Sequence, residues 1–125
     1  MNFQQLLDGA EVLFMFADDR ESPPEVNDRI RKIRNAGIKM RQITKEDNTY
    51  LMAPTSEYRW VPKEYFLNNV MLVYGDKIAV CADNNSKATI FKDKSLALSW
   101  RNTFEMLWNG IKTTEPSRST ADERF

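Results

Sequence analysis

A continuous apolar stretch followed by a strongly bounded helix constrains the fold of this chain more than any other feature. Residues 12–17, Val-Leu-Phe-Met-Phe-Ala, form a run of strand length, which is typical of a strand covered on both faces. A helix is predicted over 23–36, with Ser22 as N-cap, proline at the first helical position and a glutamate at the capping-box spacing. Gly37 is expected to end this helix, and residues 38–44 alternate as a second strand. Such tight connections predict a parallel strand pair with a right-handed crossover.

The second half of the chain predicts four further strands, two of them in a hairpin. Residues 58–61 form a strand pattern that ends at a proline. Residues 70–74 and 77–82 flank Gly75-Asp76 and predict a β-hairpin. After a polar turn, residues 88–91 predict one more strand.

The last predicted element is a long helix over 95–109, with Gly110 as its C-cap. Trp100, Phe104 and Trp108 recur on it at helical spacing. Such a stripe indicates core packing more often than a ligand cage.

These elements predict one α/β domain over residues 1–112. Its mixed sheet contains a parallel βαβ unit and an antiparallel hairpin, and the long C-terminal helix covers it. Residues 2–9 are expected to form a short leading helix, and residues 45–54 a loop or short helix. Residues 113–125 predict a polar C-terminal tail that a partner could order.

The absence of histidine excludes the commonest kinds of catalysis. Without an imidazole there is no Ser-His or Cys-His pair and no histidine metal ligand. The 18 basic and 18 acidic residues balance, which argues against bulk electrostatic attraction to nucleic acid. The chain has one cysteine, no membrane-spanning run and no basic leader, and these features predict a cytoplasmic protein. The cysteine, Cys81, is predicted to be a buried, inert thiol.

Two charged groups could form sites. Asp18, Asp19 and Glu21 follow the first strand, where a magnesium site competes with an ordinary charged loop. A basic cluster could bind phosphate or nucleic acid, but a solvated helix face is the favoured explanation. The cluster comprises Arg29, Arg31, Lys32, Arg34, Lys39 and Arg41.

The hairpin sequence from Asn69 to Val80, Asn-Val-Met-Leu-Val-Tyr-Gly-Asp-Lys-Ile-Ala-Val, resembles the core motif of the phospholipase D superfamily. In that motif a histidine, a lysine two residues later and an aspartate five further on precede a valine-rich strand. The preceding elements, the Arg59–Pro62 stretch and the closing Trp100–Trp108 helix are similar to phospholipase-D-like effector domains of bacterial and archaeal helix-turn-helix regulators. The resemblance covers roughly residues 8–112.

This chain departs from the motif where the chemistry resides. Asn69 stands at the position of the nucleophilic histidine and Met71 at that of the phosphate-binding lysine, while Asp76 is kept. Asparagine cannot act as that nucleophile and methionine carries no charge. The Gly-Ser pair that usually follows the next strand is replaced by Asp83-Asn84. The alternative explanation is that Gly75-Asp76 is simply a hairpin turn.

The resemblance therefore implies a non-catalytic binding module, with no cofactor and no metal. Arg59, Asn69, Met71 and Asp76 are its candidate ligand-binding residues, and a homodimer would face two motif copies across a two-fold axis. A small inhibitor or adaptor acting through a protein partner is the main alternative. A carboxylate- or metal-dependent enzyme is a third, and a nucleic-acid partner is the most weakly supported.

Overall fold

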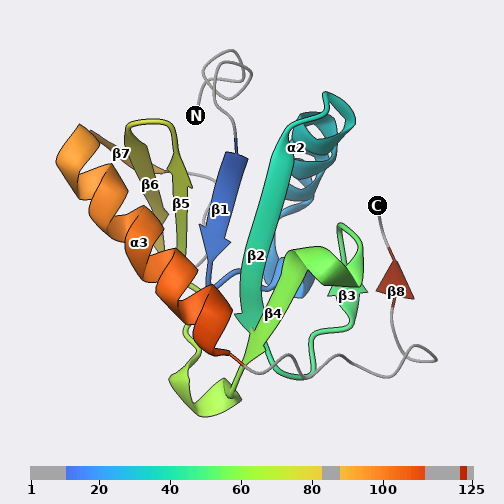
Figure 1. Ribbon diagram of the computed structural model, residues 1–125. Helices are drawn as coiled ribbons and strands as arrows, with labels where there is room; N and C mark the ends of the chain where they lie inside the picture. Colours follow the sequence, from blue (N-terminus) through green and yellow to red (C-terminus); the bar gives the residue numbers. More distant parts are fainter. Residues whose placement is uncertain (1–10, 83–87, 112–121, 124–125) are drawn as a thin grey trace.

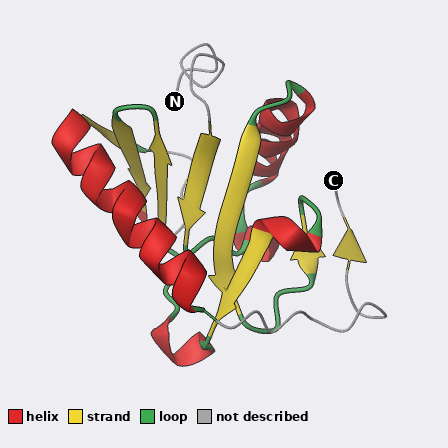
Figure 2. Cartoon of the chain, in the orientation of Figure 1, coloured by secondary structure: helices red, strands yellow, loops and turns green. Residues whose placement is uncertain are grey.

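The computed structural model describes residues 11–82, 88–111 and 122–123, and within them a mixed six-stranded sheet lies between two helices (Figures 1 and 2). The strand order is β4-β2-β1-β5-β6-β7. The strands are β1 (Glu11–Met15), β2 (Lys39–Lys45), β4 (Tyr58–Val61), β5 (Val70–Tyr74), β6 (Lys77–Cys81) and β7 (Thr89–Lys92). The predicted leading helix and the turn after β6 lie outside the described residues.

The predicted strand-helix-strand unit is confirmed. β1 and β2 are parallel, with Leu13 opposite Arg41, and α2 (Pro24–Asn35) connects them. β4 extends the parallel part of the sheet by pairing with β2, a pairing that the sequence did not predict. β5, β6 and β7 are antiparallel to their neighbours, and the predicted hairpin turns at Gly75, whose φ is +56°.

The helix ends are only partly as predicted. At Gly37, φ is +85° and the amide of Ile38 donates to the carbonyl of Ile33 at 3.4 Å, which completes the expected left-handed C-terminal turn. The predicted Ser22 cap is wrong. Pro23 is the N-cap and makes no side-chain bond, while the Ser22 hydroxyl donates to the Asp19 carboxylate at 3.1 Å.

The long helix α3 (Lys94–Gly110) begins at Asp93, whose carboxylate accepts the Leu96 amide at 2.8 Å. Gly110 is its last helical residue rather than its cap, and Ile111 is the extended C-cap. The predicted cap was wrong because the capping bond runs from the Ile111 amide to the Leu107 carbonyl at 2.9 Å, so glycine is not required there.

Each face of the sheet is covered by one helix. The α2 face includes Val12 and Phe14 of β1 packed against Ile30 and Ile33. The α3 face includes Leu13 and Met15 of β1 together with the helix side chains Ala97, Phe104 and Trp108. Side chains alternate across a strand, so β1 contributes to both cores.

Segment 45–54, predicted as a loop or short helix, contains a short strand, β3 (Tyr50–Leu51), which pairs with β8 (Asp122–Glu123). Buried Asn48 holds the segment in place through hydrogen bonds. Its amide donates to the Thr44 hydroxyl at 2.8 Å, and its backbone carbonyl accepts the Trp60 indole N–H at 3.0 Å.

We expect Phe104→Ala to lower the free energy of unfolding by about 3–5 kcal/mol, as large-to-small changes in cores do. Phe104 is fully buried and stacks on Trp108, with ring centroids 5.6 Å apart. Denaturant unfolding measures the loss. Met106→Ala is the matched control on the same helix, because Met106 is 69% exposed and should cost under about 0.5 kcal/mol. Equal losses for the two variants would contradict the placement of Phe104.

Candidate functional site

Met71 and Asn69 lie where β5 meets the carboxyl ends of the parallel strands. Met71 pairs with Met15 of β1 and with Val80 of β6, and it is half-buried on the α3 face. Asn69 immediately precedes β5, and its backbone amide donates to the carbonyl of Leu67 at 2.7 Å. Asn69 therefore lies just outside the strand, two positions before Met71.

Arg59 lies on the same row of the sheet as Met71. The register Met71–Met15–Ile43–Arg59 crosses four neighbouring strands. At the usual strand spacing, these steps separate the ends of the row by about 14 Å. The Arg59 guanidinium lies 4.1 Å from the ring centroid of Trp108 and donates to the Tyr58 carbonyl at 3.0 Å.

Asp76 lies at the opposite end of the hairpin, five residues from Met71, which corresponds to about 16 Å along the strand. Its carboxylate accepts a hydrogen bond from the Lys77 ammonium at 3.1 Å, and its backbone carbonyl accepts the amide of Asp93. The Lys77 contact lowers the pKa of Asp76. The structure therefore brings Arg59, Asn69 and Met71 to one end of the sheet and leaves Asp76 at the other.

Apolar side chains surround the Met71 position. Phe16 and Phe66 form an edge-to-face pair with centroids 6.1 Å apart, and with Met71 they border the core of the α3 face. Tyr65 and Leu67, on either side of Phe66, are 72% and 73% exposed. We call Phe16, Tyr65, Phe66, Leu67 and Met71 the apolar edge.

Backbone strain marks the same place. Phe16 has φ of +60°, which a large side chain rarely adopts and which costs about 1–3 kcal/mol. β1 ends at Met15, two positions short of the predicted run, and Phe16 follows it with its ring edge-to-face with that of Phe66. Positive φ at a bulky residue has no sequence signal, so sequence reasoning missed it.

Arg41, predicted as part of a basic surface, is enclosed instead. It donates to Glu11 at 2.9 Å and also bonds Glu105. Its guanidinium lies 5.3 Å from the Phe104 centroid and 5.1 Å from that of Trp108. The two carboxylates raise the pKa of Arg41, so this residue links β1, β2 and α3.

The two aspartates after β1 are buried rather than part of a solvated loop, while Glu21 is exposed. Asp18 forms an ion pair with Arg20 at 2.7 Å and is 1% exposed. Asp19 is 2% exposed and accepts hydrogen bonds from Ser22 at 3.1 Å and from Gln42 at 3.2 Å. Burial raises the pKa of Asp19 from 3.8 to about 6, against the lowering effect of those two bonds. In residues 11–82, 88–111 and 122–123, no three metal-binding side chains come together.

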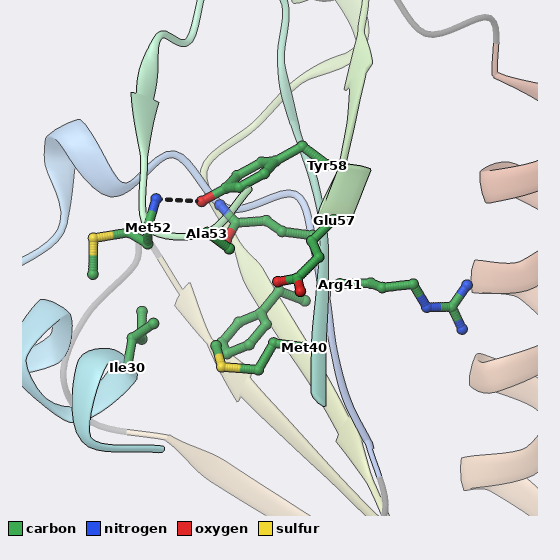
Figure 3. A pocket seen from close by; sticks show the side chains of 9 residues that line it. Ile30, Met40, Arg41, Met52, Ala53, Glu57 and Tyr58 are labelled. Carbon is green, nitrogen blue, oxygen red and sulfur yellow. Dashed lines mark hydrogen bonds between the residues drawn. The ribbon is translucent and has the colours of Figure 1, made fainter. Parts of the chain in front are cut away.

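A small hollow lies between α2 and β2 (Figure 3). Ile30, Met40, Met52 and Tyr58 line it, and the Tyr58 hydroxyl accepts the amide of Met52 at 2.7 Å. Arg41 extends away from it toward the other face. The hollow has room for little more than a water molecule, so it is a packing defect rather than a ligand site.

Cys81, predicted to be buried, is half-buried at the end of β6, where burial raises the pKa of its thiol. None of the helices in the described ranges is long and apolar enough to cross a membrane.

We expect the raised pKa of Asp19 to make the free energy of unfolding depend on pH. Its native pKa of about 6 exceeds its ordinary 3.8, so between these values the native state binds more protons than the unfolded state. The free energy of unfolding should therefore fall as pH rises through this window, by up to about 3 kcal/mol. Denaturant unfolding from pH 4 to 7 measures the slope. Asp19→Asn should remove that contribution, and parallel curves for the two proteins would contradict the assignment.

No family model matches the sequence, and no curated protein matches it. Several solved structures resemble it, including Nuc and TrmBL2. Nuc from Salmonella typhimurium, a phospholipase D family member, has a TM-score of 0.57 at 12% identity, over 91% of this chain and 89% of that one. TrmBL2, an archaeal chromatin protein with a novel mode of DNA binding, has a TM-score of 0.56 at 14% identity.

The TrmBL2 match covers 90% of this chain and 48% of the other, so this chain spans about half its length. At such low identity the likeness is one of fold. The sequence resemblance through the hairpin, the mixed sheet with its C-terminal helix and both structural matches agree. The chain therefore has a phospholipase-D-like fold.

Proposed function

We propose that this chain is a non-catalytic, phospholipase-D-like binding module that pairs with a second copy of itself through the apolar edge. The observation that carries the proposal is the exposure of Tyr65 and Leu67 beside half-buried Phe16, Phe66 and Met71. Clustered exposed aromatic and aliphatic side chains are characteristic of protein interfaces.

The proposal of a non-catalytic role rests on the side chains at the motif positions. The chain has no histidine, Asn69 occupies the nucleophile position and Met71 the phosphate-binding position. Met71 lies among apolar neighbours, an environment suited to packing rather than to stabilising a phosphoryl transition state.

A second copy is the partner that the motif favours. The resemblance implies one motif copy per chain and a cleft completed across a two-fold axis, and such an interface is self-complementary. Arg59 and Asn69 would then border a shared groove in which a small ligand could bind. Asp76 lies too far along the hairpin to join them in one protomer, so a role for it in binding requires a contribution from the second copy.

A small inhibitor or adaptor is the second candidate, because the apolar edge could equally receive a different protein. Nucleic acid has less support. Arg41 is enclosed by two glutamates, and Arg31 and Arg34 of α2 bond to Tyr50 and Met52. The DNA binding of TrmBL2 therefore has no evident counterpart on these arginines. A single cysteine fits a reducing compartment, and we propose the cytoplasm.

We expect no phosphodiesterase activity on bis-p-nitrophenyl phosphate or on DNA, because neither motif position supplies a nucleophile or a charge. Release of nitrophenol and cleavage of plasmid DNA are the measurements. Asn69→Ala separates a contaminant from the protein itself. Turnover that co-purifies with the chain and is abolished by this substitution would contradict the non-catalytic assignment.

We expect the wild type to be dimeric at tens of micromolar, and Met71→Glu to weaken the dimer at least about tenfold. A two-fold axis applies the inserted charge twice, and the repulsion should be stronger at low salt. Light scattering behind a sizing column measures both proteins. Leu67→Glu tests the same edge at a 73% exposed position, and Met106→Glu, at a 69% exposed position on α3, is the control.

Circular dichroism must show that the three variants remain folded. A monomeric wild type rules out pairing. A dimer that is indifferent to both Met71→Glu and Leu67→Glu shows pairing through another surface.

A further inference from the structure

The chain's own C-terminal residues form a sheet with β3, apart from the main sheet. β8 (Asp122–Glu123) runs parallel to β3 (Tyr50–Leu51), with Tyr50 opposite Asp122 and Leu51 opposite Glu123. In Figure 1 this pair lies beside β4, away from α3. The two strands come from distant parts of the sequence, so the strand that pairs with β3 is not one of its neighbours in sequence.

β3 is also fixed by contacts that do not involve β8. Leu51 is fully buried. The Tyr50 amide bonds to the Asn48 side-chain oxygen at 2.9 Å, and the Met52 amide to the Tyr58 hydroxyl at 2.7 Å. A strand fixed in this way loses little conformational entropy when another strand pairs with it.

Two arginines of α2 flank β3. Arg31 donates to the Tyr50 hydroxyl at 3.2 Å, and Arg34 donates to the Met52 carbonyl at 3.0 Å. The register places position 122 beside Tyr50, and the sequence supplies two consecutive acidic residues at 122–123. The positive charges of Arg31 and Arg34 are therefore complementary to the negative charges that the sequence provides at 122–123.

We propose that β3, with Arg31 and Arg34, is a strand-addition site for an extended peptide that carries an acidic pair, and that Asp122–Glu123 is its intramolecular occupant. Main-chain bonds to β3 would supply affinity and the two arginines would supply selectivity. Recognition would depend on the acidic pair rather than on the net charge of the tail, because the tail also contains the basic residues Arg118 and Arg124. A partner with such a segment must displace the tail. This site is separate from the apolar edge.

The test adds a fluorescently labelled peptide of residues 117–125 in trans to the full chain. A tethered tail has an effective concentration on the order of millimolar, so a peptide of about 100 µM affinity should bind the wild type about tenfold more weakly than a chain whose tail is released. Asp122→Lys with Glu123→Lys in the chain releases the tail. We expect this variant to bind the peptide at least about tenfold more tightly than the wild type, as measured by fluorescence anisotropy.

Matched variants separate recognition from general charge effects. Glu25→Lys with Glu64→Lys changes two exposed carboxylates elsewhere and should leave peptide affinity at the wild-type level. Arg31→Glu with Arg34→Glu in a chain that keeps its acidic tail should repel that tail and abolish binding of the wild-type peptide, and a peptide with lysines at 122 and 123 should restore binding. Restoration also shows that the variant is folded. The proposal is overturned if the released chain does not bind the peptide, or binds it no more tightly than the wild type does. It is also overturned if replacing the two arginines leaves peptide affinity unchanged.

Discussion

The burial of β1 on both faces is the constraint on which the rest of this structure depends. Four consecutive residues, Val12 to Met15, are almost inaccessible to solvent. Alternation sends two of them to each side of the sheet, so the strand needs a helix on each face and a strand on each edge. α2 and β2 supply one face and one edge through the crossover, while α3 and β5 supply the others.

Charged groups hold the layers together at two places. Arg41 of β2 bonds to Glu11 of β1 and Glu105 of α3 while its guanidinium lies against Phe104 and Trp108. Its charge is thus neutralised where it is desolvated, as buried charges require. Asp19 is different. Its hydrogen-bond donors, Ser22 and Gln42, are neutral, and they offset only part of the desolvation that raises its pKa.

One fold can carry different functions because function resides in side chains at the site rather than in the sheet. At the carboxyl end of the parallel strands, Met71 and its aromatic neighbours give an apolar surface with Arg59 at its border. On the other side of β2, β3 and the α2 residues Arg31 and Arg34 form a polar surface. The two surfaces differ in chemistry.

The sequence by itself determined the βαβ unit, the Gly75 hairpin and the aromatic stripe of α3, because each depends on local periodicity and turn chemistry. It also determined the departure from the phospholipase D motif at Asn69 and Met71. Only the tertiary structure decided which motif positions meet. Arg59 joins the Met71 row because β4 pairs with β2, and Asp76 is remote because an extended strand separates it from Met71. Long-range strand pairing also enclosed Arg41 and placed β8 on β3. Spacing along the chain encodes none of these distances, because each depends on elements that are far apart in sequence.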